Sequence, residues 1–334
     1  MKRTLAALLS PLLFVGCNLD ELPEFPTDVV VDYKQEMRDF VRDISRYAKG
    51  IDSEFIVIPQ NGIELVTTNG RDNGPLDTAY VGAVDGLAQE SLFFGQNGID
   101  QPTPLSERQR LQRFLDLAKD DGAVILVTDF AFSEVNIDDS YRDNEDAGYI
   151  SFAADHEELD NIPGYPPEVH NSNFDNIEFL DEASNFLNLI NPRLYSTRQD
   201  LVDAISETDY DVVIIDFFFN GEEYTAEQIE QLKVKNNGGR RLLIAYVSIG
   251  QAEDDRFYWK SFWPTNPPAW LEERVPGTPG NYYVEYWKQG WQDIIFGNND
   301  SYLFRILDAD FDGAYLDYVD VFDHFENLEP EESE

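Results

Sequence analysis

The chain has 334 residues, of which 42% are hydrophobic and 13% aromatic, enough apolar material for one large core or two small ones. Its 65 acidic and 24 basic residues give a formal charge of −41 at pH 7. This charge argues against nucleic acid as a partner, because phosphate binding needs a basic face. It fits either a surface that stays soluble through its charge, as in a saline habitat, or a site that attracts a cationic substrate.

The first residues are typical of a secretory signal peptide, which we expect to occupy residues 1–16. Two basic residues, Lys2 and Arg3, precede the apolar stretch Leu5–Val15. This stretch is too short to span a bilayer as a mature helix. We therefore exclude it from the fold and expect the protein to be exported.

Cys17 is the single cysteine of the chain, so an exported protein has no internal disulfide to form. Leu13–Cys17 resembles a bacterial lipobox, which implies cleavage before Cys17 and lipidation of its thiol; the alternative is an ordinary signal peptide that ends in a coincidental cysteine. We expect an acidic tether over residues 17–33, a folded domain over 34–328 and an acidic tail over 329–334. The protein would then lie in the cell envelope, at the periplasmic face or the cell surface, and contact the membrane through its lipid anchor alone.

Hydrophobic periodicity predicts helices and strands in alternation through the first half of the domain. The expected elements are a helix over 34–49, strands over 54–58 and 80–85, a helix over 106–119, and strands over 123–129 and 148–153. The acidic run 138–146 lacks a metal-binding pattern, and we interpret it as a solvated loop.

Residues 155–192 are polar, acidic and rich in Asn and Pro, and we interpret them as a long connector. After them we expect strands over 193–196, 211–216, 241–247 and 313–317, with helices over 200–205 and 226–234 and a helix that ends near 304. Strands separated mostly by helices predict an α/β fold with parallel strands. Several strands end in polar or acidic residues, as at the active face of an eight-stranded (β/α)8 barrel of the TIM type. A doubly wound open sheet is the alternative, but no Gly-rich phosphate loop follows any strand.

Residues 241–322 are the most informative segment of the chain. They contain two apolar strands that end in acidic residues, with all five tryptophans between the strands. Paired carboxyls can divide acid and nucleophile roles in glycoside hydrolysis, and flat rings can stack on sugars. The alternative is that the tryptophans pack in the core and the carboxylates form a solvated turn.

Four motifs resemble glycoside hydrolase family 114, the endo-α-1,4-polygalactosaminidase family, including its bacterial branch formerly labelled cysteinyl-tRNA-synthetase-related. They are Ala245–Trp259, Asp312–Asp317, Ile58–Gly62 and Gly86–Phe94. Their order differs from that of the family, in which the segment matching 241–320 precedes the one matching 54–90. The resemblance therefore implies a circularly permuted barrel, with strands in the order 5-6-7-8-1-2-3-4 along the chain and the 155–192 connector joining the ancestral ends. A closed barrel tolerates new termini on an exposed loop.

The resemblance implies a catalytic pair. Asp317 matches the aspartate after strand four, the expected nucleophile, and Glu90 matches the glutamate after strand six, the expected acid/base. One carboxyl must stay ionised while the other holds a proton near neutral pH. The implied substrate is an α-1,4-galactosamine-type polysaccharide, which is cationic where its amino groups are free, and no metal or other cofactor is implied.

Further residues at strand ends or on the aromatic insertion are candidates for substrate binding. Asp320 would orient Asp317 or cap the following helix, and Trp259 and Trp287 would stack on sugar rings or pack in the core. The other candidates are Asn61, Asp129, Asp216, Tyr246, Ser248 and Glu253. Two functional alternatives stay open at this point: a carbohydrate-binding lipoprotein without turnover, and a hydrolase of a different glycan.

Overall fold

The computed structural model describes residues 31–328 of the chain, which divides into two units, Met1–Asp32 and Tyr33–Glu334. The expected signal peptide, the lipidated Cys17 and the acidic tail lie outside the described residues. Among the helices of the described part, none has the length and apolar character that a bilayer-spanning helix needs. The second unit holds the helices and strands named below.

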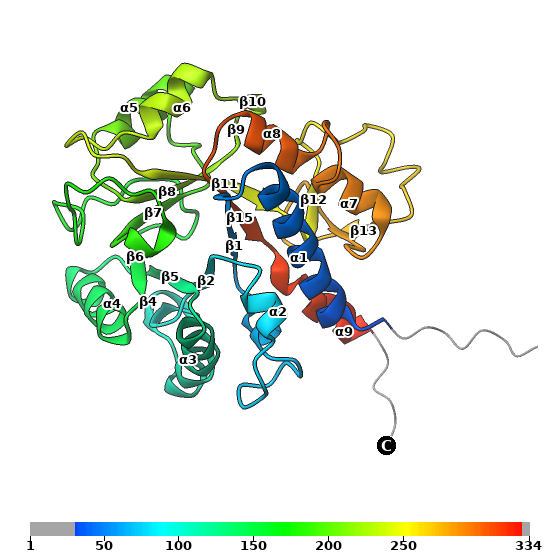
Figure 1. Cartoon of the computed structure of the whole chain (residues 1–334), viewed down its shortest axis with the longest axis horizontal. Coiled ribbons are helices and arrows are strands. Elements are labelled where there is room, and N and C mark those ends of the chain that lie inside the picture. The colour runs from blue at the N-terminus through cyan, green and yellow to red at the C-terminus, as the bar shows by residue number, and fades with distance from the viewer. Residues whose placement is uncertain (1–30, 329–334) are drawn as a thin grey trace, which may run out of the picture. The chain divides into compact units, whose positions relative to one another are not determined.

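Two parallel sheets carry the fold of this unit (Figure 1). In the five-stranded sheet the order is β1 (Ile56–Pro59), β15 (Gly313–Asp317), β11 (Leu242–Ser248), β8 (Val212–Asp216) and β7 (Phe186–Leu189). In the three-stranded sheet the order is β2 (Gly86–Glu90), β5 (Val124–Phe130) and β6 (Ile150–Ala154). Every pair of neighbours within these two sheets is parallel, so the carboxyl ends of the strands in each sheet share one edge.

The two sheets meet at β1 and β2. Gln60 forms an isolated parallel bridge with Ala88, and the Asn61 N–H donates to the Ala88 carbonyl at 2.8 Å. At the other end of the junction, the Asp85 carboxylate accepts from the Val57 N–H at 2.8 Å. At the opposite edges of the two sheets, β6 of the three-stranded sheet lies beside β7 of the five-stranded sheet. The ends of β15, β1 and β2 are therefore consecutive neighbours.

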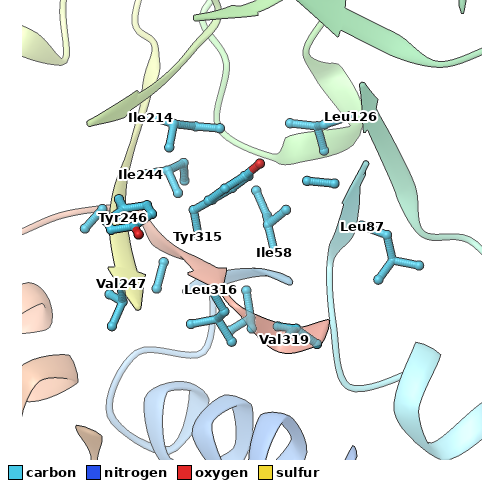
Figure 2. Close-up of a cluster of buried hydrophobic side chains, with 14 of the residues drawn as sticks. Ile58, Leu87, Leu126, Ile214, Ile244, Tyr246, Val247, Tyr315, Leu316 and Val319 are labelled. Atoms are coloured by element: carbon cyan, nitrogen blue, oxygen red, sulfur yellow. The ribbon is translucent and has the colours of Figure 1, made fainter. Parts of the chain in front are cut away.

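Side chains from both sheets pack into one core (Figure 2). The ring of Tyr315 lies at its centre, near Ile58, Ile214 and Ile244 from three other strands. Their strands are covered on both faces, and for this reason the sequence of each strand is a nearly continuous apolar run. The carboxyl ends of the strands are thus held by a dry, closely packed interior.

Helices lie outside the strands in Figure 1. They are α1 (Tyr33–Ile51), α2 (Thr78–Val81), α3 (Leu105–Asp120), α4 (Glu134–Ala147), α5 (Arg198–Ser206), α6 (Ala226–Leu232), α7 (Gln289–Ile295), α8 (Tyr302–Asp308) and α9 (Phe322–Leu328), with 3-10 turns η1 (Ile63–Val66), η2 (Leu180–Glu182) and η3 (Val319–Val321). α5 and α6 begin with capping boxes at Thr197 and Thr225, which satisfy backbone N–H groups in their first turns.

Three small antiparallel pieces project beyond the carboxyl ends of the parallel strands. The residues after Glu90 form the hairpin β3 (Phe94–Gly95) and β4 (Gly98–Pro102), and β9 (Phe218–Phe219) pairs with β10 (Glu222–Glu223) after β8. The insertion after β11 contains the sheet β12 (Gln251–Glu253), β14 (Asn281–Val284) and β13 (Leu271–Arg274). All three extend the face on which the strands end.

The predicted mixed α/β fold with parallel strands is confirmed, but the strand predicted over 80–85 is wrong. Its first residues belong to α2, because the Asp77 carboxylate caps that helix by accepting from the Tyr80 N–H at 3.0 Å. The strand of this region begins at Gly86 instead. Glu90 is therefore the last residue of β2.

The strand predicted over 193–196 is also wrong, since those residues form a turn. The strand at that place in the fold is β7, which lies inside the predicted connector 155–192. A buried polar residue, Asn188, interrupts the apolar run of β7 and hid it from the sequence pattern. The acidic run 138–146 is part of α4, whose buried face includes Ile137 and Tyr141, and the loop interpretation fails there.

Candidate active site

Three neighbouring strands bring the two predicted catalytic residues to one edge of the fold. Asp317 ends β15, Glu90 ends β2, and β1 runs between them. On the other side of β15, Ser248 of β11 is paired in register with Asp317. Parallel pairing thus gathers groups that are far apart in the sequence.

Asp317 is held by two short hydrogen bonds. The Tyr246 hydroxyl donates to its Oδ2 at 2.8 Å, and the Tyr318 N–H donates to its Oδ1 at 2.7 Å. Burial and the nearby negative charge of Glu90 raise the pKa of Asp317 to about 8, against the effect of these two donors. Because burial removes Asp317 from water, its carboxyl loses its proton near neutral pH and not in the acidic range of an ordinary aspartate.

Glu90 lies in a setting of amide side chains. Asn61 accepts from the Glu90 N–H at 3.1 Å through its Oδ1, and its Nδ2 lies 3.5 Å from the Glu90 carboxylate. Burial raises the pKa of Glu90 to about 7, although hydrogen bonds from Asn61 and Gln60 oppose the rise. Glu90 and Asp317 thus both ionise in the same pH range, and each makes the ionisation of the other harder.

The backbone turns sharply just after each of these strands. Asn61, Ser91 and Tyr318 have φ angles of 56°, 57° and 57°, in the left-handed region that side chains other than glycine rarely adopt. At Gly250, an added Cβ would lie 2.1 Å from the Tyr318 carbonyl oxygen, so only glycine permits this approach. Such backbone conformations cluster at functional sites, where surrounding structure holds them.

A cleft of about 400 Å³ opens beside Glu90, and its lining is strongly acidic. The one basic residue in the lining, Arg110, is already occupied, since it donates to Glu64 at 2.6 Å and to Glu107 at 2.7 Å. The lining includes Asn61, Glu64, Gln89, Glu90, Ser91, Gly95, Gln96, Glu107, Arg110, Asp320 and Asp323. The cleft therefore presents excess negative charge to whatever enters it.

Two side chains in the lining of this cleft have few hydrogen bonds from the described part of the chain. The Gln89 Oε1 atom is buried without a hydrogen-bond partner, while its amide nitrogen donates to Asn61 and to the Glu90 carbonyl. The Asp320 carboxylate accepts from its own backbone N–H, and no side chain among residues 31–328 forms a hydrogen bond or an ion pair with it. Burial and the charges of Asp323 and Glu64 raise the pKa of Asp320 to about 6. A ligand that offers donors would bond to the Asp320 carboxylate, whereas the Gln89 Oε1 atom is closed off from solvent.

Asp216 and Glu253 form a different acidic pair, and Arg256 neutralises it. The Arg256 guanidinium contacts both Asp216 oxygens at 2.9 Å and donates from Nε to Glu253 at 2.6 Å. Its side chain is only 8% exposed. The sequence analysis proposed the two carboxylates as substrate ligands and missed Arg256, although the spacing of Glu253 and Arg256 was visible.

Asp129 and Ser248 are used within the protein. The Asp129 carboxylate is fully buried and accepts from four donors: the Phe93 and Phe94 N–H groups, the Ser140 hydroxyl and the Asn144 amide. The Ser248 hydroxyl donates to the Gln251 carbonyl at 2.8 Å. We therefore interpret Asp129 and Ser248 as positioning residues for the loops after β2 and β11, in contrast to the prediction that they bind substrate.

The two tryptophans predicted to stack on sugars are half-buried in aromatic clusters. Trp259 packs on Tyr282, with the ring centroids 4.8 Å apart, and edge-on against Trp263, with the ring centroids 5.1 Å apart. Trp287 packs edge-on against Phe325 at 4.8 Å and near Tyr286 at 4.9 Å. These contacts support the packing alternative for both residues.

Asp310 and Asp312, in the acidic segment before β15, form ion pairs with basic side chains. Lys233 lies 2.8 Å from Asp310 and 3.2 Å from Asp312, and Arg240 donates to Asp312 at 2.7 Å. Within residues 31–328, no group of three or more His, Cys, Asp or Glu side chains is arranged to hold a metal ion.

Comparison with known proteins gives a partial match. Residues 194–334 match the model of the glycoside-hydrolase family GH114, so the resemblance seen in the motifs is confirmed over this segment. An uncharacterized protein of Thermotoga maritima is 44% identical over 121 residues, 36% of each chain. Uncharacterized proteins of Methanocaldococcus jannaschii and Deinococcus radiodurans are 38% and 33% identical over 46% and 39% of this chain. The matches span about two fifths of these relatives, at 36%, 42% and 39% of their lengths.

Proposed function

On the premise that residues 194–334 carry the sequence of glycoside-hydrolase family GH114, we propose that this protein hydrolyses an α-1,4-linked galactosamine-type polysaccharide from within the chain. Asp317 serves as the nucleophile and Glu90 as the acid/base. The observation that carries the proposal is the pair of half-buried carboxyls at the ends of β15 and β2, the two strands that flank β1, both with pKa values raised towards neutrality.

The hydrogen bonds of the two carboxyls support this division of roles, although the pKa of Asp317, about 8, lies above that of Glu90, about 7, so that Glu90 loses its proton first in the free protein. Asp317 accepts two hydrogen bonds shorter than 2.9 Å, one from a phenol, which favours its ionised form. Glu90 has weaker amide donors, and it lines the cleft whereas Asp317 does not. A buried anion suits attack on the sugar, and a carboxyl that reaches the cleft can exchange its proton with water.

The reaction then follows from these positions. An Asp317 oxygen attacks the anomeric carbon while the glycosidic C–O bond breaks and Glu90 transfers its proton to the leaving oxygen. In the second step Glu90 removes a proton from water, the water oxygen attacks the anomeric carbon, and the bond to Asp317 breaks. Two displacements at one carbon retain the anomeric configuration, which is the stereochemical outcome we propose. As the acceptor of the Tyr246 bond, Asp317 keeps its orientation throughout.

The acidic cleft supports an amino sugar as the substrate. A protonated amine would be drawn to the excess negative charge beside Glu90. Its N–H groups match the Asp320 carboxylate, which accepts from no side chain of residues 31–328. A neutral sugar could satisfy this acceptor with a hydroxyl group, but it would gain nothing from the charge.

We also propose that the two sheets close into a circularly permuted (β/α)8 barrel. In support, the strands β1, β2, β5, β6, β7, β8, β11 and β15 neighbour one another in chain order, and β6 lies beside β7. Permutation leaves this order unchanged, because it only moves the chain ends. A family model read in one direction can follow just one of the two exchanged segments, which agrees with a match limited to residues 194–334. For the segment ahead of the fold, we propose export and a lipid anchor at Cys17.

The test is hydrolysis of partially deacetylated α-1,4-galactosaminogalactan by the wild-type protein beside Asp317→Asn and Glu90→Gln. We expect oligosaccharide release by the wild type and a loss of at least about a hundredfold in each variant. Both variants should still bind the polymer, since neither substitution changes the size of the side chain. Release that survives a substitution removes that residue from the pair, and a folded wild type that releases nothing contradicts the proposed activity.

A further inference from the structure

Phe132 is an exposed aromatic ring on the face where the parallel strands end. It follows β5 by two residues and precedes α4, and 60% of its surface is open to solvent. Val135, one turn further along, is 69% exposed. Neither residue belongs to the aromatic clusters that bury Trp259 and Trp287. Phe132 also plays no part in the catalytic pair, so its exposure needs another explanation.

The backbone under Phe132 is held firmly. Asp100 of β4 accepts from the Phe132 N–H at 3.1 Å, from the Ser133 N–H at 3.0 Å and from the Ser133 hydroxyl at 2.9 Å. The side chain of Asn136 donates to the Asp100 carbonyl at 3.1 Å. Burial acts to raise the pKa of Asp100, but the hydrogen bonds from Ser133, Asn136 and Phe132 together lower it. The ring is thus presented on an ordered support.

The same support reaches the catalytic cleft. Gly95 and Gln96, in the hairpin that follows Glu90, line the cleft, and Asp100 in the second strand of that hairpin holds Phe132. Gly95 has a φ of 123°, and an added Cβ there would lie 2.9 Å from the Phe130 ring, so glycine lets the hairpin rest against the end of β5. One hairpin therefore borders the cleft and carries the contact to Phe132.

The sheet register limits how far the ring lies from the acid/base. Glu90 is paired with Thr128, four residues before Phe132. Four extended residues span at most about 14 Å and paired strands lie about 5 Å apart, so the Cα atoms of Glu90 and Phe132 are within about 19 Å of each other. A polymer that leaves the cleft over the hairpin would reach the ring within a short length of chain.

From this geometry we propose that Phe132 is a stacking platform for a pyranose ring of the bound polysaccharide, outside the cleft that holds the cleavage point. The electron-rich face of the ring would meet the C–H face of the sugar. The platform rests on the proposed function, since it needs a polysaccharide in the cleft. It gives long chains an advantage over short ones, because a short oligosaccharide in the cleft would not extend to Phe132.

The experiment measures affinity for partially deacetylated α-1,4-galactosaminogalactan by affinity gel electrophoresis, in the Asp317→Asn background so that the polymer stays intact. Relative to the Asp317→Asn parent, Phe132→Ala should weaken binding about three- to tenfold, and Phe132→Tyr should leave binding unchanged. Phe132→Leu, which keeps an apolar side chain without the ring, should resemble Phe132→Ala. All variants should keep the thermal midpoint of the parent, because the ring is exposed.

Phe174→Ala is the matched control. Phe174 is 82% exposed, and its carbonyl lies near Gly239 before β11, at the opposite ends of the strands. It should bind as the parent does. Equal affinity in Phe132→Ala and its parent, or an equal loss in Phe174→Ala, would overturn the platform.

Hydrolysis by the wild-type active site, assayed beside binding, separates the two proposals. Polymer cleavage with unchanged affinity in Phe132→Ala removes the platform alone. Weaker binding in Phe132→Ala without any cleavage by the wild type keeps the platform and removes the enzymatic activity. If the parent does not bind the polymer, the platform and the proposed substrate both fall.

Discussion

Two acidic groups stand on the same face of this protein, and only one of them is neutralised. Asp216 and Glu253 share the buried guanidinium of Arg256, with contacts of 2.6 to 2.9 Å. Glu90 and Asp317 have hydrogen bonds from neutral donors, and no basic side chain of residues 31–328 forms an ion pair with either carboxylate. Burial raises the pKa of Asp216 and of Glu253 against the effect of Arg256, and it raises the pKa values of Glu90 and Asp317, which have no cation beside them, to about 7 and about 8. Burial without a counter-ion is thus what separates a chemical site from a structural one here.

The largest expected effect comes from breaking the neutralised group. Arg256→Met leaves two buried carboxylates without their cation, and it should lower the free energy of unfolding by about 3–5 kcal/mol. Urea denaturation would measure the change. The triple variant Asp216→Asn, Glu253→Gln, Arg256→Met should recover most of this loss, because no unpaired charge remains. A single variant that loses less than about 1 kcal/mol would contradict the ion-pair assignment.

The second prediction concerns Glu90 and Asp317, the pair without a cation, and the way in which the stability of the protein depends on pH. The pKa values of Glu90 and Asp317 are raised by folding to about 7 and about 8, so the folded state binds these protons more tightly than the unfolded state does. The destabilisation that they cause is absent below the ordinary carboxyl pKa and grows as pH rises through about 8.

Asp317→Asn should therefore melt above the wild type, and the difference in Tm should widen between pH 5 and pH 8. Thermal denaturation at several pH values tests this expectation. Asp216→Asn is the control, since Asp216 has a cation beside it and its removal should bring no gain. A constant difference in Tm across this range would mean that Asp317 ionises normally.

A smaller effect is expected from Tyr246→Phe, which removes the 2.8 Å hydrogen bond to Asp317 and keeps the ring. The bond stabilises the ionised nucleophile and fixes its orientation, so kcat should fall about tenfold, with KM little changed. The acidic limb of the pH profile should move upward, because the pKa of Asp317 rises when a donor is lost. An unchanged limb would show that the tyrosine serves packing alone.

Much of the fold was predictable because strands and helices with strong periodicity dominate it. The strands that end at Asp216, Ser248 and Asp317 were found from apolar runs followed by polar residues. β7 was missed because Asn188 lies in its middle, and the polar character of this residue makes sense only beside Thr128 inside the packed core. Periodicity alone cannot report such tertiary compensation.

The site was predicted in part for a related reason. The family resemblance pointed to Glu90 and Asp317, but pairing with Arg256 depends on the fold of the insertion after β11, which no local pattern reveals. Aromatic content pointed to Trp259 and Trp287, whose rings pack on other rings. The exposed ring at Phe132 carried no signal in the sequence, because exposure is a property of the fold.

The most direct test of the central claim is kcat/KM for polymer hydrolysis as a function of pH, in the wild type and in Glu90→Gln. If Glu90 and Asp317 share about one proton near neutrality, the wild-type profile is bell-shaped with its maximum between about pH 7 and 8, and the residual activity of Glu90→Gln loses the alkaline limb. An alkaline limb that persists in Glu90→Gln would contradict the account, because another group would then hold the catalytic proton.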